Sequence, residues 1–315
     1  MKIFLIVLSL AIIAVAPFFG QIDLSLKNLL DISTTDYKIF FDLRVPRVLL
    51  AFFVGAILAL SGLVFQTIFR NPMSTPFTLG VASGATLFTA IGIIIGLSAF
   101  ISLFAFLGAV ITIIVLFMIS ARFKTYETSS MLLVGIALSF FYSASLMIVF
   151  FLSDLQENYE IVRFTMGSLD VVGFNEVYLV TIAGIFLFSL VKKQSYHIKL
   201  LLTSHEFAFL KGVNVKKTNY ILLLSVSVAV GISVSVTGPI GFVGLIIPHI
   251  LKNMMRQSAD KLILPIFFYG GVFLVLCDVI ARNLSTASDI PIGVVTAFIG
   301  TPFFIYLIIS RKRQN

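Results

Sequence analysis

The strongest constraint on the fold is a run of 51 residues, from Asn71 to Ala121, that contains no charged side chain. A bilayer core is about 30 Å thick and takes about 20 apolar residues per helical span, so this run is long enough for two spans. The whole chain agrees, because 59% of its 315 residues are hydrophobic and only 11% are charged, against about 25% in soluble domains. We therefore expect an all-α polytopic membrane protein, built as a single domain over residues 1–315.

Ten apolar segments follow one another along the chain. The first resembles a signal peptide, but Pro17 would follow the cleavage site, so we expect an uncleaved span. Residues 162–169 predict a short helix at the membrane interface. The expected spans lie at residues 1–20 and 48–69, twice within 71–121 with a turn near 96–99, at 128–153 and 177–191, twice within 218–251, and at 262–281 and 290–310.

The basic residues predict the orientation of these spans. An even number of spans places both termini on one side, and 16 of the 22 Lys and Arg residues fall on that side. We therefore expect both termini in the cytoplasm and the chain in the inner, or plasma, membrane. This excess also explains the net charge of +8. Basic stripes with interleaved aromatic residues are missing, so the sequence does not indicate nucleic-acid binding.

Glycine and proline interrupt two of the apolar runs, in NPMSTPFTLGVASGA after the second span and in TGPIGFVGLIIPHILK (Thr237 to Lys252) after the seventh. The two interruptions lie five spans apart, which predicts two inverted five-span pseudo-repeats of the kind found in transporters. Broken helices in a bilayer must be buried in protein. The second stretch is uncharged before Lys252 and carries only His249 as a polar ionisable group, so we expect it to pack rather than to bind.

No catalytic or metal-binding pattern is present. The phosphate-binding loop GxxxxGK[ST] is absent, and His205-Glu206 does not open a zinc motif because Phe209 stands where the second histidine is needed. Cys277 is the single cysteine, which excludes an internal disulfide or a CxxC site. Gly167-Ser168 has no partnering histidine within a span. The sequence predicts no catalytic residue, no metal site, no cofactor and no enzyme activity.

Ionisable residues inside the spans would indicate an ion-coupled carrier, and the chain almost lacks them. The exception is Asp278, which lies four residues before Arg282 and is expected to pair with it on one helix face. A secondary transporter stays open as the alternative. If transport is active, the energy is expected to come from a partner protein.

Residues 200–217 are the best candidate to receive that energy. Ser204 can cap a helix, Phe207 and Leu210 give it an apolar face, and Gly212 can stop it. A short amphipathic helix of this kind is one that a soluble motor domain could grip. An interfacial loop that carries cytoplasmic lysines is the alternative from spacing alone.

Three arginines, Arg44, Arg47 and Arg282, lie at span ends on the predicted outer side. Long basic side chains at such positions commonly extend toward the membrane surface. A set of them can also orient an acidic partner and raise its rate of association. Both interpretations stay open from position alone.

Several segments together resemble the FecCD-type permeases, which include the ferric-siderophore, haem and cobalamin importers. They are RVPRVLLAFFVGAILALSGLVFQTIFRNPMSTPFTLGVASGA, MLLVGIAL, GVNV, TGPIGFVGLIIPHILK and DVIARNLSTASDIPIGVVTAFIGTPFF. The resemblance runs from about Arg44 to the C-terminus. It implies a ten-span subunit that pairs with a second permease subunit, binds two cytoplasmic ATP-binding subunits and receives substrate from an outside binding protein.

The resemblance also implies roles for individual residues. Arg44, Arg47 and Arg282 match the docking arginines for the binding protein, and spans five and ten match the helices that line the pathway. The remaining matches are Glu206, Phe207, Leu210, Lys211 and Gly212, with Ser204 before them, for coupling to the ATPase, and Asn71, Met73, Thr128 and Ser129 for two cytoplasmic gates.

Two positions depart from the family pattern. Phe164 stands where the short helix after span five usually has tryptophan, and Lys252 stands where arginine is usual. The first departure leaves the lining of the pathway and the size of the cargo open. We expect the permease subunit of an ABC importer for a metal chelate, first a ferric siderophore, with cobalamin or haem as alternatives. A homodimer and a heterodimer both stay open.

Overall fold

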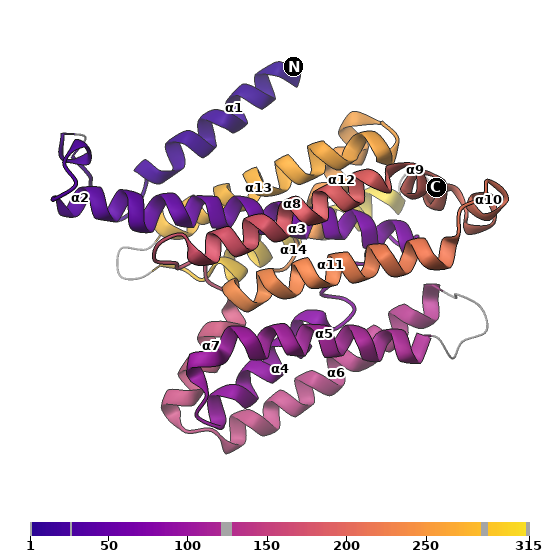
Figure 1. Ribbon diagram of the computed structural model, residues 1–315, viewed down its shortest axis with the longest axis horizontal. Helices are drawn as coiled ribbons and strands as arrows, with labels where there is room; N and C mark the ends of the chain where they lie inside the picture. Colours follow the sequence, from indigo (N-terminus) through magenta and orange to yellow (C-terminus); the bar gives the residue numbers. More distant parts are fainter. Residues whose placement is uncertain (1, 26, 121–127, 285–288, 313–315) are drawn as a thin grey trace.

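The computed structural model describes residues 2–25, 27–120, 128–284 and 289–312, and every regular element within them is helical. The helices run along one long axis of a bundle, with α2 at one end and α10 at the other (Figure 1). We call the α2 end the outer end and the α10 end the inner end. The main helices are α1 (Lys2–Val15), α2 (Thr35–Lys38), α3 (Val45–Ile68), α4 (Val81–Ile94), α5 (Ile101–Ser120), α6 (Thr128–Leu152), α7 (Leu155–Met166), α8 (Asn175–Lys193), α9 (Ser195–Thr203), α10 (His205–Leu210), α11 (Val215–Thr237), α12 (Val243–Met255), α13 (Ala259–Asn283) and α14 (Ile292–Lys312).

The apolar helices match the ten expected spans. Six segments in the described part of the chain are long and apolar enough to cross a bilayer, and four shorter apolar helices accompany them. Among the shorter ones, α4 has 14 residues and α12 has 13, which at 1.5 Å per residue gives about 20 Å each. That length is less than the hydrocarbon core, so non-helical backbone at residues 71–80 and 238–242 completes both crossings.

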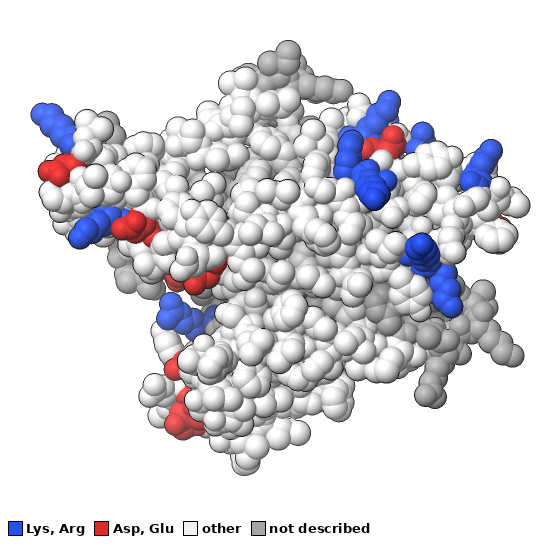
Figure 2. Space-filling view, in the orientation of Figure 1, with Lys and Arg blue, Asp and Glu red and all other residues white. Residues whose placement is uncertain are grey.

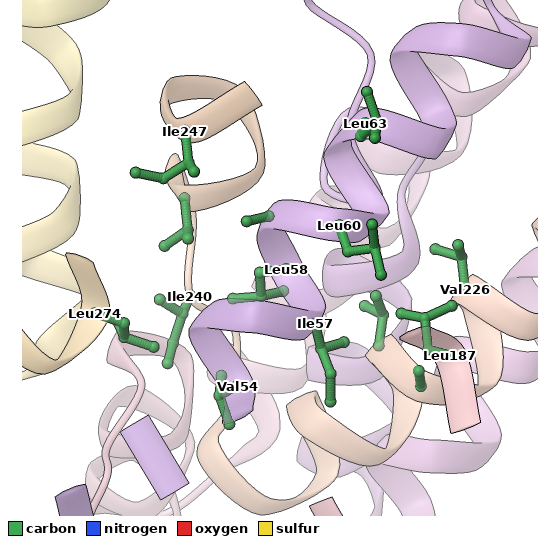
Figure 3. Close-up of a cluster of buried hydrophobic side chains, with 14 of the residues drawn as sticks. Val54, Ile57, Leu58, Leu60, Leu63, Leu187, Val226, Ile240, Ile247 and Leu274 are labelled. Carbon is green, nitrogen blue, oxygen red and sulfur yellow. The ribbon is translucent and has the colours of Figure 1, made fainter. Parts of the chain in front are cut away.

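Helix α3 lies at the centre of the bundle. All of its residues from Val54 to Ile68 are buried, as expected for a helix that is hydrophobic on every side. It packs against α8, α11, α12 and α13. In the core, Ile57 of α3 lies toward Leu187 of α8 and Val226 of α11, and Leu58 lies on the other side with Ile240 and Ile247 (Figure 3).

Glycines let α3 approach its neighbours at backbone distance. A Cβ added at Gly62 would overlap the carbonyl oxygen of Gly244 in α12, and one added at Gly55 would overlap that of Gly270 in α13. Lipid tails are as apolar as leucine, so membrane helices associate largely through this kind of close packing of small residues. The glycines of α3 therefore set its distance from α12 and α13.

The packing repeats with inverted order, as the sequence predicts. In one group α3 packs against α13 and α12, and in the other α11 packs against α5 and α4. These are the equivalent spans of the two expected five-span halves. The short helices α4 and α12 thus hold equivalent places, because each packs on the helix that precedes the break of the other half, α4 on α11 and α12 on α3.

Three predicted boundaries were wrong. Helix α7 was expected over 162–169 but begins at Leu155, because Asp154 and Glu157 form a reciprocal capping box. The eighth span was expected to end by residue 251 and the ninth to begin at 262, yet α12 continues to Met255 and α13 starts at Ala259. The broken part of the Thr237 to Lys252 stretch is only residues 238–242, and the rest is helix, with Pro248 inside it.

We predict that Gly62→Ala lowers the thermal unfolding midpoint of the detergent-solubilised protein. The added methyl meets backbone rather than a flexible side chain, so α3 and α12 must separate, at a cost of about 1–3 kcal/mol. Gly241→Ala is the matched control, since its Cβ would meet no atom within 4 Å. Equal midpoints for the two variants would contradict the close contact between α3 and α12.

Candidate functional site

The outer end brings the three predicted arginines together. Arg44 and Arg47 lie one turn apart at the start of α3, and Arg282 lies in the last turn of α13. All three line one cavity of about 350 Å³, with Asp170 and Asp289 beside them. We call these five residues and Asp278 the outer cluster.

Arg47 is the hub of the outer cluster. Its Nε donates to Asp278 Oδ1 at 2.9 Å, and its Nη1 lies 2.7 Å from Asp170 Oδ1 and 2.6 Å from Asp289 Oδ2. The side chain is 13% exposed. One guanidinium therefore joins α3 to α13, to the segment after α7 and to the segment before α14. Planar arginine is suited to several directed contacts of this kind.

The predicted pair of Asp278 and Arg282 is confirmed, with Asp278 Oδ2 3.0 Å from Arg282 Nη2. The side chain of Asp278 is 0% exposed, so the pair is buried and does not extend to the surface as a snorkelling pair would. A buried carboxylate is stable only when it is paired, and here two arginines share that role. Among the described residues, no group of His, Cys, Asp or Glu is arranged to hold a metal ion.

Arg44 and Arg282 also hold the segment that follows α1. Arg44 Nη1 donates to the carbonyl oxygen of Phe18 at 3.1 Å and its Nη2 to that of Ile22, while Arg282 Nη1 donates to Phe19 at 3.1 Å. Both arginines are buried, whereas position alone suggested exposed charges. These carbonyl oxygens lie at the end of the short 3₁₀ turn Ala16–Phe18 or after it, where no helical amide is available to donate. The guanidinium groups are their donors instead. A docking role for the arginines stays a prediction.

The charges divide between the two ends of the molecule. In Figure 2, Lys and Arg side chains gather at the inner end, the outer end carries both signs, and an uncharged band lies between them. This distribution matches the cytoplasmic excess of basic residues on which the predicted orientation depends.

At the inner end, residues 200–217 contain the end of α9, the short helix α10 that the sequence predicts, and the start of α11, and we call them the coupling segment after their predicted role. Ser204 Oγ accepts from the Phe207 amide at 2.9 Å, which caps α10. Gly212 follows with φ of +80° and ends the turn. Ala208 packs into a small core with Leu201, whereas Leu210 is 80% exposed.

The exposed surface of α10 and the residue after it carries both charged and apolar side chains. Glu206 and Lys211 lie on the surface, and the exposed apolar side chains include Phe209, which is 71% exposed and which the sequence reasoning missed. The signal was available, because Phe209 and Leu210 adjoin each other in a segment outside the spans. Figure 1 shows α10 projecting from the inner end of the bundle.

His205 connects α10 to the end of α3. Its imidazole lies beside the backbone of Ile68, and burial together with the nearby charge of Arg70 lowers its pKa. The imidazole is therefore neutral at pH 7. The coupling segment is thus in direct contact with the helix whose other end carries Arg47.

The predicted gate residues are described only in part. Asn71 Oδ1 accepts from the Met73 amide at 2.9 Å, which makes a tight turn directly after α3. Met73 is exposed. The side chains of Thr128 and Ser129 lie outside the described residues, so their distance from this turn stays a prediction.

A pocket of about 740 Å³, open at the surface of the molecule, lies where the two breaks meet, and we call it the central cavity. Phe77 from the first break and Phe242 from the second both line it, and none of its lining residues is charged. The sequence predicts a packing role for the second break, whereas in the structure it also lines this cavity. Of the two spans expected to line a pathway, α14 contributes and the described residues of α6 do not. The lining residues are Phe77, Thr165, Met166, Pro239, Gly241, Phe242, Gly293, Val294, Ala297, Phe298, Thr301 and Pro302.

Comparison with known proteins decides the family. The model of the FecCD transport family matches residues 3–310. The chain belongs to the FecCD transport family. A haemin transport system permease protein of Yersinia pestis is 33% identical over 99% of this chain and 96% of its own length, and a vitamin B12 import system permease of Vibrio vulnificus is 31% identical over 97% and 93%.

The fold comparison agrees with the family. A solved transporter described as of the metal-chelate ABC type, in an inward-facing conformation, superposes with a TM-score of 0.86 and 30% identity. The match covers 98% of this chain and 100% of that one. The FecCD permease described above is therefore similar to a whole transporter subunit from end to end.

We predict that Asp278→Asn destabilises this permease strongly. The change leaves Arg47 and Arg282 facing a neutral group in a buried site, and breaking a buried pair typically costs about 3–5 kcal/mol. The measurement is the thermal unfolding midpoint in detergent. Glu176→Gln removes an exposed carboxylate as the control and should leave the midpoint nearly unchanged. A midpoint for Asp278→Asn equal to that of the control would show that the cluster does not stabilise the fold.

Proposed function

We propose that this chain is the membrane-spanning permease subunit of an ABC importer that carries a metal chelate. The observation that supports it most directly is the family match over residues 3–310 together with a bundle similar from end to end to a metal-chelate-type ABC transporter. In the bilayer, both termini lie in the cytoplasm, so the outer cluster faces the side from which cargo arrives.

The cargo is a metal chelate, first a ferric siderophore, with haem and cobalamin as the alternatives. Relatives named for haemin and for vitamin B12 are both about one-third identical to this chain, so overall similarity does not separate these cargoes. All three are large metal complexes. They pass along α14 and the central cavity, which carries no charge that would hold a cargo tightly.

We predict that the permease, reconstituted with its ATP-binding subunits and binding protein, takes up a labelled ferric siderophore faster than haemin or cobalamin. The measurement is ATP-dependent accumulation of each labelled compound in proteoliposomes, with an inactive ATP-binding subunit as the control. Uptake driven by a proton gradient without ATP would contradict the ABC mechanism and favour a secondary transporter. Faster uptake of haemin or cobalamin would show that this compound, and not the siderophore, is the cargo. The ABC mechanism would be unaffected by that result.

Energy enters through the coupling segment. The chain has no nucleotide-binding loop, and α10 presents charged and apolar side chains beyond the inner end of the spans. The permease works as a homo- or heterodimer with two ATP-binding subunits. Each ATP-binding subunit binds α10 of one permease. Their closure moves α10, and the His205 contact with the end of α3 transmits that movement to the centre of the bundle.

We predict that replacing both Glu206 and Lys211 with alanine uncouples ATP hydrolysis from uptake. These exposed side chains lie on either side of the apolar residues of α10, so their loss weakens the grip without disturbing the buried core. Uptake should fall sharply while ATP hydrolysis continues. A double replacement of Lys192 and Lys193, which are exposed on the same side of the membrane, is the control. Full coupling in the Glu206 and Lys211 variant would show that the segment has another role.

At the outer end, an acidic surface of the binding protein docks over the outer cluster. Arg47 Nη1 is shared by Asp170 and Asp289, and both carboxylates line the cavity in front of it. A carboxylate of the partner can therefore compete with them for Arg47. Exposed charges are screened by salt, so this association weakens as ionic strength rises.

A further inference from the structure

Phe242 has an unusual backbone conformation. Its φ is +67°, and the amide of Val243 donates to the carbonyl of Gly241 at 2.8 Å. A hydrogen bond between residues two apart, around a residue with positive φ, defines a classic γ-turn, which is rare and strained. For a bulky aromatic residue the conformation is an outlier. Such strain persists only where the surrounding structure imposes it, and it concentrates at functional sites.

Close backbone contacts hold the start of the break in which Phe242 lies. The break is bound on one side by the end of α7, because Ser168 N donates to Thr237 O at 2.8 Å and a Cβ at Gly238 would overlap the carbonyl of Phe164. Helix α14 meets the same two segments, because a Cβ at Gly293 would overlap the carbonyl of Met166 and lie 3.4 Å from that of Pro239. The backbones of α7, the start of the break and α14 therefore meet closely.

The ring of Phe242 lies against α14. A Cβ added at Gly300 would overlap the ring, so the absence of a side chain at Gly300 makes the space that the ring fills. Ala297 lies three residues earlier on the same face of α14 and lines the central cavity with Phe242. The ring thus occupies the edge of the cavity next to the helix along which the cargo passes.

A turn alone does not require this residue. Glycine reaches positive φ without strain, and asparagine does so more readily than phenylalanine. Phe242 is half-buried rather than part of the closed core. The presence of an aromatic residue at this position is therefore best explained by the place of its ring at the edge of the central cavity.

We propose that Phe242 is the shutter of the central cavity. With φ positive, its ring fills the space over Gly300 and narrows the cavity. When the γ-turn opens to an ordinary conformation, the ring leaves Gly300 and the cavity widens beside α14. This inference rests on the proposed transport function and adds the residue that controls passage.

Access to a probe cysteine at Ala297 tests the shutter. The native Cys277 is buried and is replaced by serine in the probe chain. The rate at which a membrane-impermeant maleimide labels Ala297→Cys is measured on the full-length protein in detergent. Phe242→Gly and Phe242→Ala both remove the ring, and only the glycine variant also removes the strain. Both should raise the rate several-fold, whereas Phe242→Leu should raise it much less. Equal rates with and without the ring would overturn the proposal.

A second pair of variants distinguishes a local effect of the Phe242 ring from a general loosening of the helix bundle. Gly300→Ala pushes the ring out of its place and should itself raise the labelling rate. In the Phe242→Gly background it should add nothing, because the two changes act on the same contact. Additive effects would overturn the proposal. So would faster labelling of Cys277 in a Phe242→Gly chain that keeps it, since that would show that the whole bundle has loosened.

The labelling needs neither cargo nor ATP, so its outcome is independent of the uptake experiment. If uptake fails with every chelate while removal of the ring still exposes Ala297→Cys, the transport proposal falls, and what stands is that the Phe242 ring covers part of the cavity. If uptake succeeds and labelling does not change, the shutter falls alone.

Discussion

The close backbone contact of α3 with α12 and α13 is the interaction on which the rest of the structure depends. Inside a bilayer, apolar side chains gain little by leaving lipid for protein, so the fit of surfaces decides which helices associate. The glycines of α3 meet glycines of both neighbours, which brings the polar backbone of the α11–α12 break inside the bundle. The same helix carries Arg47 at its outer end and meets His205 beyond its inner end. A movement of α3 therefore affects both ends at once.

The ten spans could be predicted because each depends on local composition. Uncharged runs, bounded by Lys, Arg, Gly or Pro, define where a helix can cross, and Ser204 and Gly212 define where a short one begins and stops. The inverted repeat followed from the matching positions of the two breaks. Boundaries failed where a polar side chain extended a helix, as Asp154 does for α7.

The outer cluster could be predicted only in part, since its contacts join distant parts of the chain. The pair of Asp278 and Arg282 is local and was visible as a four-residue spacing. Asp170 and Asp289 lie 123 and 242 residues from Arg47, in segments whose composition indicates only polar loops. The positive φ of Phe242 was equally hidden, because nothing about phenylalanine indicates it. Its ring packs against Gly300 of α14, a contact between segments that local sequence does not reveal.

The shortness of α4 and α12 has a consequence for how the chain enters the membrane. A helix of 13 or 14 residues cannot cross a bilayer by itself, and the broken backbone beside it cannot be left facing lipid. Neither segment is therefore stable as a separate insertion unit, and each needs its packing partner at hand. The packing partner of α12 is α3, which is synthesised earlier. The packing partner of α4 is α5, which follows it directly in the chain. The order of the helices along the sequence is thus also a workable order of assembly during synthesis.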